Sequence, residues 1–257
     1  MNYLLLTLSL TLGLFLSMLL LLEVGRRLGR RRLAKETGAP AGLGAVEGAI
    51  FGLLGLLLAF SFAGAASRFD ARRHLIVEET NAIGTAYLRL DLLPAEAQTA
   101  LRESFRRHLD SRLEVYRRLP DLAAAKAELA RATQLQAEIW SQAIAACREG
   151  GGQAATMLLL PALNAMIDIT TTRTLAAQMH PPTVIFVMLF GLALAASLLA
   201  GYGLAAVGSG TWMHRIGFAA AVTVSVYVIL DLEFPRLGLI RVDAFDQALV
   251  ELRDSMK

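Results

Sequence analysis

The chain has 257 residues, of which 55% are hydrophobic and only 18% charged, and its mean hydropathy is +0.51. These values exclude an ordinary soluble domain and predict a membrane protein. The length leaves room for a few membrane-spanning helices and one modest extramembrane unit. The single cysteine, Cys147, excludes an intrachain disulfide and a metal site built from several cysteines.

The first predicted element is an uncharged apolar run over residues 3–22, which is long enough to cross a hydrocarbon core of roughly 30 Å. No basic residue precedes it and no small-residue cleavage site follows, so we expect a retained helix and not a signal peptide. A basic block follows directly: Arg26, Arg27, Arg30, Arg31, Arg32 and Lys35. Beside a membrane span such a block sets the topology, so we expect a basic cytoplasmic loop and no nucleic-acid partner.

The second predicted span covers residues 43–66 and carries small residues at steps of three or four. Gly48, Gly52 and Gly55 form the centre of this ridge. Small side chains let two helices approach closely in a membrane, so we expect the ridge to mediate packing between copies of the chain. Phe62 lies on the face opposite the ridge, and we assign it to the lining of a pore.

Two further spans are predicted near the end of the chain. His180, Pro181 and Pro182 end the preceding helix, and the third span then runs over residues 183–207. After a short turn, the fourth span covers residues 216–232. Four spans, with the basic block inside, place both termini and the middle segment outside the cytoplasm. The predicted division is 1–66 for the first two spans, 67–182 for a helical extramembrane region, and 183–257 for the last two spans and a C-terminal helix.

The middle segment shows helical periodicity and no strand pattern. One amphipathic helix starts after Pro94, and a second follows Asp121, which we expect to cap its N-terminus. These two helices are predicted to form a hairpin with a solvated outer face. The fold class is therefore all-α: a polytopic membrane protein with four transmembrane helices and a helical extramembrane hairpin.

The helix predicted over residues 69–93 carries a second, polar stripe. Its middle consists of Glu78, Asn81 and Thr85, with His74 and Arg89 at its ends. A solvated face normally favours long charged side chains, whereas amide and hydroxyl groups suit a confined hydrated passage or a helix contact. We therefore assign Glu78, Asn81 and Thr85 to the lining of a pore.

A second helix of mixed character has the sequence "LLLPALNAMIDITTTRTLAAQM", residues 158–179. It adjoins the third span as the first mixed helix adjoins the second, so the two mixed helices can pack together. We expect Glu78 or Glu79 to lie near Arg173, and Asp168 to lie near Arg89. The predicted structural network consists of Glu79, Arg89, Asn164, Asp168 and Arg173.

Four segments resemble the bacterial bestrophin-like family, four-span membrane proteins with a domain of unknown function: "EETNAIGTAYLRLDLLP", "LLPALNAMIDITTTR", "HPP" and "DLEFPRLGLIRV". True bestrophins are oligomeric anion channels, and the family is remotely similar to them. The resemblance implies a homo-oligomeric, multi-pass protein of the bacterial inner membrane that acts on ions, with no cofactor. The acidic calcium-binding cluster of bestrophins is missing from the sequence, so calcium gating is not expected.

Two functional classes remain open. No hydrolase, metalloprotease or phosphate-loop motif occurs and the four histidines are scattered, so an enzyme and a metal site are not expected. The first class is a homo-oligomeric pore, an ion channel of bestrophin-like type, in which copies of the second span surround an axis. The second class is a non-conducting membrane scaffold or sensor whose helical region binds a partner.

Overall fold

The computed structural model describes residues 3–34, 43–206 and 212–256, which form helices and turns with no strand within these ranges. The chain divides into two compact units. The first consists of Met1–Arg68 and His180–Phe234, and the second of Phe69–Met179 and Pro235–Lys257. One long helix, α2 (Leu43–Leu88), contributes to both units.

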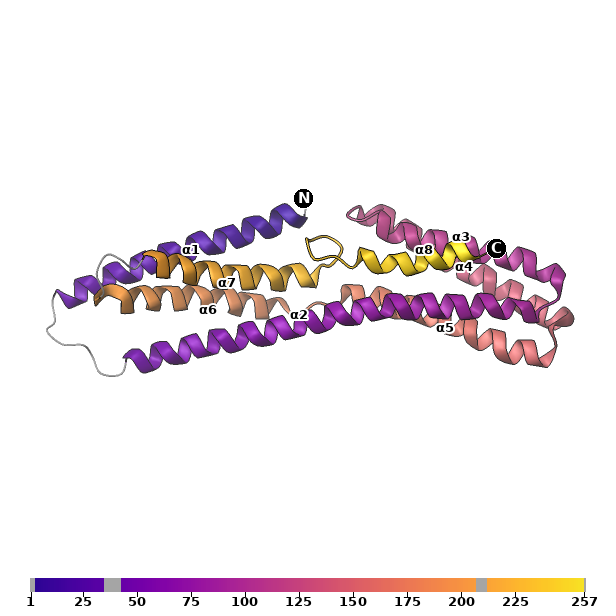
Figure 1. The fold of residues 1–257 in the computed structure, drawn as a ribbon, viewed down its shortest axis with the longest axis horizontal. Helices are drawn as coiled ribbons and strands as arrows, with labels where there is room; N and C mark the ends of the chain where they lie inside the picture. The colour runs from indigo at the N-terminus through magenta and orange to yellow at the C-terminus, as the bar shows by residue number, and fades with distance from the viewer. Residues whose placement is uncertain (1–2, 35–42, 207–211, 257) are drawn as a thin grey trace. The chain divides into compact units, whose positions relative to one another are not determined.

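The first unit contains α1 (Tyr3–Leu33), the first half of α2, α6 (Thr183–Gly203), η3 (Leu204–Ala206) and α7 (Trp212–Glu233). Figure 1 shows α1, α6 and α7 running side by side. Among the described residues, four stretches of helix are long and apolar enough to cross a membrane: Tyr3–Leu33, Gly44–Leu92, Gly152–Gly203 and Trp212–Glu233. The predicted four-span, all-helical membrane fold is confirmed.

The helix boundaries follow local signals in the sequence. Pro182 is the N-cap of α6, as the His-Pro-Pro break predicts, because proline has no N–H to donate and fixes its own φ. The basic block differs from the expected loop: Arg26 to Arg32 lie in the last turns of α1. Arginine is a good helix former, and positive charge is favourable at a helix C-terminus.

Glycines hold α1 and α6 unusually close. A Cβ added at Gly201 would lie 2.0 Å from the carbonyl oxygen of Leu22, and one at Gly25 would lie 2.0 Å from the carbonyl oxygen of Leu198. Only glycine permits such an approach of two backbones. These positions, together with Gly29, make the tight helix contact within the chain.

The glycine ridge of α2 is different, because a Cβ added at Gly48, Gly52 or Gly55 would meet nothing within 4 Å. The ridge therefore packs against no other helix within the ranges that the structure describes. Its expected part in packing between copies stays a prediction.

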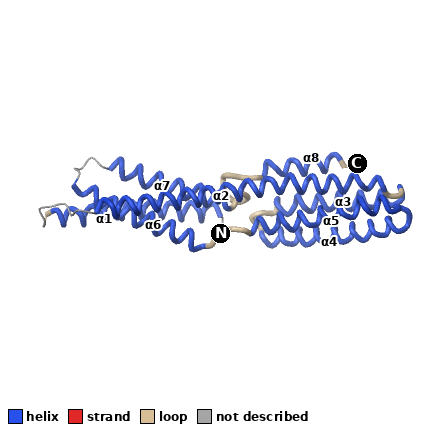
Figure 2. The backbone as a smooth tube through the Cα atoms, turned by 90° about the horizontal axis from the view of Figure 1, so that it is seen from below, coloured by secondary structure: helices blue, strands red, loops and turns tan. Residues whose placement is uncertain are grey.

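The second unit contains the end of α2, η1 (Arg89–Leu92), α3 (Ala95–Arg117), α4 (Leu122–Ala146), the π-helical turn η2 (Cys147–Gly151) and α5 (Gly152–Gln178). Figure 2 shows α3, α4 and α5 as neighbouring, nearly parallel rods. The helical hairpin after Pro94 is confirmed. Asp121 caps α4 as expected, since its Oδ1 accepts hydrogen bonds of 3.0 Å from the backbone N–H groups of Ala123 and Ala124.

The C-terminal segment packs in the second unit, whereas the sequence-based division joined it to the last two spans. It contains η5 (Asp243–Asp246) and α8 (Gln247–Ser255). Leu249 is fully buried, and Arg253 forms an ion pair of 2.7 Å with Asp110 of α3. An amphipathic helix buries its apolar side wherever a complementary core exists, which sequence order alone does not reveal.

Candidate functional site

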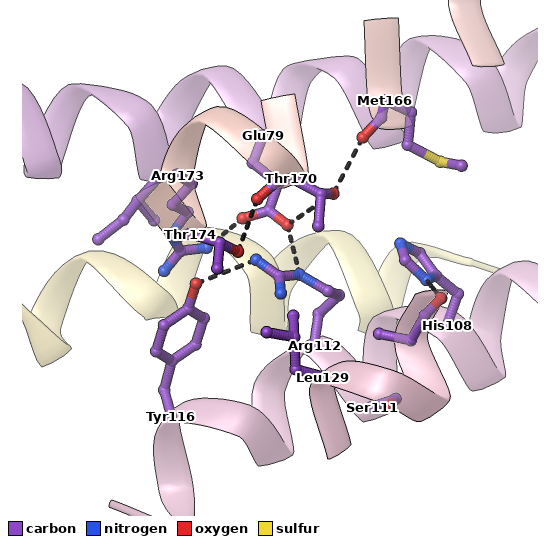
Figure 3. A network of polar contacts seen from close by, with 12 residues as sticks. Glu79, His108, Ser111, Arg112, Tyr116, Leu129, Met166, Thr170, Arg173 and Thr174 are labelled. Carbon is purple, nitrogen blue, oxygen red and sulfur yellow. Dashed lines mark hydrogen bonds and ion pairs between the residues drawn. The ribbon is translucent and has the colours of Figure 1, made fainter. Parts of the chain in front are cut away.

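Glu79 of α2 is a completely buried carboxylate held between two arginines (Figure 3). Its Oε1 accepts a hydrogen bond of 2.6 Å from Nε of Arg112 on α3, and its Oε2 pairs with Nη1 of Arg173 on α5. Arg112 is also fully buried, and Arg173 is 5% exposed. A buried charge requires compensation, and here one carboxylate joins three helices.

The ion-pair chain continues into the C-terminal segment. Arg173 also binds Asp246 of η5, at 3.1 Å. Asp246 in turn binds Arg236, which lies after α7 and also pairs with Asp243 at 2.9 Å. Alternating charges therefore connect α3, α2, α5 and η5 within the second unit.

The ring of Tyr116 lies at the centre of the guanidinium groups. The guanidinium Cζ atom of Arg173 lies 4.1 Å from the ring centroid of Tyr116. The Cζ atoms of Arg236 and Arg112 lie 4.3 Å and 5.5 Å from it. The tyrosine hydroxyl accepts a hydrogen bond of 3.0 Å from Arg112. Burial alone would lower the pKa of Arg112, but the Tyr116 hydroxyl and Glu79 hold it above its ordinary value, so this guanidinium stays charged.

Sequence reasoning left Arg112, Tyr116 and Asp246 out of the network. A signal was present for Arg112: it shares a helical face with Leu101, Phe105 and Leu109, all of which are buried. A charged residue in the middle of an apolar stripe predicts a buried partner. The identity of that partner, 33 residues earlier in the chain, is decided by the packing of the helices.

Three expected members of the network, Arg89, Asn164 and Asp168, lie elsewhere. The expected Asp168–Arg89 contact is wrong, because Nη1 of Arg89 donates to the carbonyl oxygen of Leu158 at 2.5 Å. Asp168 and Asn164 are exposed on α5. The buried side of α5 includes Met166 and Arg173, and at about 100° per residue Asp168 lies roughly 200° around the helix from Met166.

The polar stripe lies on the exposed side of α2. Glu78, Asn81 and Thr85 are all exposed, and the side chains of Asn81 and Thr85 make no hydrogen bond within the described ranges. Asn81 and Thr85 line an open groove of about 280 Å³, together with Arg89 and three residues of α5. The α5 residues are Pro161, Ala162 and Ala165. Glu78 is thus available to solvent or ions, while its neighbour Glu79 is fully engaged in ion pairs.

The other residue assigned to a pore, Phe62, belongs to the first unit, where it is 47% exposed. Its role stays a prediction. In the described part of the chain, no three histidine, cysteine or acidic side chains converge where a metal ion could be held.

His108 on α3 adds a titratable group beside the network (Figure 3). Its side chain is fully buried, and Nδ1 lies 3.3 Å from the carbonyl oxygen of Ala132. Burial, together with the positive charge of Arg112, lowers the pKa of His108 to about 4. The imidazole is therefore neutral in the folded protein at physiological pH.

This lowered pKa predicts a pH dependence of stability. Between pH 6.5 and 4 the unfolded chain binds a proton at His108 that the folded chain does not, so stability falls as the pH falls through this window. The loss reaches about 3 kcal/mol near pH 4 and is absent above pH 7. Thermal unfolding of wild type and His108→Gln in detergent, measured from pH 4 to 7.5, should give curves that diverge only at acid pH. Parallel curves would contradict the neutral, buried state of this histidine.

Together, the fold and the site define a four-span, all-helical membrane protein with a buried ion-pair network beside an exposed polar groove. The profile of the Bestrophin-like domain matches residues 12–244, and the chain belongs to this family. No curated protein matches the sequence.

Solved structures support the same fold. The chain is similar to two variants of a bacterial bestrophin homolog from Klebsiella pneumoniae. The first has 14% identity and a TM-score of 0.72, with 94% of this chain and 99% of that chain covered. The second has 15% identity and a TM-score of 0.68, with coverage of 97% and 98%.

Proposed function

We propose that the protein is a homo-oligomeric pore of the bacterial inner membrane, an ion channel of bestrophin-like type and not an enzyme. The observation that carries this proposal is the pair of adjacent carboxylates on α2. Glu79 is buried in ion pairs, whereas Glu78 is 49% exposed in its side chain and shares a stripe with two unpartnered polar groups, Asn81 and Thr85. Rings of carboxylates and hydroxyls from several copies set the electrostatic field of a pore.

Two further features support assembly around α2. The first half of this helix exposes its glycine ridge, and in the membrane such a ridge favours close contact with another helix. Membership of the Bestrophin-like family supports the same function. In the proposed pore, Phe62 contributes to the lining of the membrane part, and Glu78, Asn81 and Thr85 to the lining outside it.

Ion flux through reconstituted liposomes tests the proposal. Glu78→Gln removes one negative charge per copy, so the ratio of cation to anion permeability should fall, while Thr85→Val should lower flux by removing a hydroxyl from the path. Glu96→Gln on α3 is the matched control, since Glu96 is exposed outside the stripe and has no ion pair in the described part of the chain. Both test residues are exposed, so thermal stability should change little.

Measurements of assembly and of ion permeability can each contradict the proposed pore. Crosslinking of wild-type protein in native membranes should yield a closed oligomer. If only monomer forms, or if the assembled wild-type protein is impermeable to a broad panel of ions, the protein is a scaffold or sensor. In that case the Glu78 and Thr85 substitutions should alter partner capture and leave flux at zero.

A further inference from the structure

The end of α1 has two faces of different chemistry. Gly25 and Gly29 pack against α6. On the opposite face lie three arginines at steps of three and four residues: Arg27, Arg30 and Arg31. The glycine contacts fix the rotation of α1 about its axis, so the arginine face is directed away from α6.

One carboxylate, Glu23, takes up part of the positive charge near this end. Glu23 accepts hydrogen bonds from three guanidinium groups: those of Arg26, Arg27 and Arg215. Glu47, a second carboxylate, lies beside Gly203 of α6. Arg30 and Arg31 are exposed and make no hydrogen bond or ion pair within residues 3–34, 43–206 and 212–256. They are therefore available to an external anion.

The same face of α1 is apolar two to three turns before Arg27. Leu16 is 56% exposed and Leu20 is 64% exposed, and with Arg27 they follow the helical repeat. At about 1.5 Å per residue, Arg27 to Arg31 lie roughly 8 to 14 Å beyond the apolar run that ends at residue 22. This is the level of the lipid phosphates, which long arginine side chains reach by bending back toward the membrane.

We propose that this face binds one anionic phospholipid, with its acyl chains along Leu16 and Leu20 and its phosphate between Arg30 and Arg31. The exposed leucines on this face distinguish a lipid from a soluble acidic partner, because a soluble partner would not contact leucines at membrane depth. Trp212, 61% exposed at the start of α7, lies at the same end of the first unit, and tryptophan favours the membrane interface. The inference goes beyond the proposed pore, because it requires only a membrane-spanning α1.

Native mass spectrometry of the delipidated full-length protein tests this inference. Dioleoylphosphatidylglycerol and dioleoylphosphatidylcholine are titrated separately, with glycerol 3-phosphate and inorganic phosphate as probes without acyl chains. The test variant is Arg30→Gln/Arg31→Gln. The matched control is Arg107→Gln/Arg148→Gln, which removes the same charge from two exposed, unpartnered arginines of the described second unit.

We expect wild type and control to retain phosphatidylglycerol in preference to phosphatidylcholine. The Arg30/Arg31 variant should bind phosphatidylglycerol about 10- to 30-fold more weakly, with unchanged thermal unfolding in neutral detergent. Equal retention of the two lipids would overturn the proposal, as would an equal loss in the control variant. Binding of glycerol 3-phosphate or inorganic phosphate as tight as that of the lipid would assign the arginines to a soluble anion and also overturn it.

Discussion

Replacing Glu79 by alanine should strongly destabilise the protein. The substitution leaves Arg112, which is fully buried, and Arg173, which is 5% exposed, without their shared counter-charge. Breaking a buried ion pair typically costs about 3–5 kcal/mol because an uncompensated charge remains in the interior. Thermal unfolding in detergent should show a fall in Tm on the order of 10 °C.

The adjacent residue provides the control. Glu78→Ala removes the same charge from the same helix, but the Glu78 side chain is 49% exposed, with only a distant contact of 3.9 Å to His74. Its Tm should therefore stay within about 2 °C of wild type, since exposed ion pairs contribute little. Equal destabilisation by the two substitutions would show that the network around Glu79 does not stabilise the fold.

Replacing Gly201 by leucine should abolish most folded protein. Any side chain at this position starts with a Cβ 2.0 Å from the carbonyl oxygen of Leu22, a backbone atom that cannot move aside without separating α1 from α6. Overpacking of this kind costs several kcal/mol where the backbone must shift. Detergent-solubilised yield and Tm, followed by size-exclusion chromatography, measure the effect. A Gly201→Leu protein with wild-type yield and Tm would contradict the close approach of the two helices.

Gly52→Leu is the matched comparison, with the same change at another glycine of a membrane helix. Because a Cβ at Gly52 meets nothing within 4 Å, the monomer should fold normally. If the ridge packs copies together as proposed, crosslinking in native membranes should show loss of the oligomer. An intact oligomer would remove the ridge from the interface.

The ion pairs of Glu79 also bear on the exposed stripe. Two arginines from α3 and α5 hold the carboxylate of Glu79, so they fix the rotation of α2 about its axis in the second unit. Asn81 and Thr85, two and six residues further along the same helix, are then directed into the groove. The buried network therefore supports the position of the side chains to which the proposed pore assigns ion contact.

Much of the architecture was determined by the sequence itself, because it depends on short-range patterns. The four apolar stretches are each long enough for a membrane, and a chain has few other ways to accommodate them. The His-Pro-Pro break sets the end of α5 and the start of α6, and the cap at Asp121 sets the start of α4. Each signal acts within a few residues of the feature that it produces.

The tertiary structure alone decided which of these residues meet. Glu78 and Glu79 are chemically equivalent neighbours, and only the packing of α3 and α5 makes the second one the buried partner of Arg112 and Arg173. Glycines likewise occur at helical spacing on α1 and α2, but Gly25 and Gly29 of α1 lie against α6, whereas a Cβ at Gly48, Gly52 or Gly55 of α2 would meet nothing within 4 Å in the described part of the chain. Helical periodicity defines a face, whereas the partner of that face depends on contacts between residues far apart in sequence, which no local pattern contains.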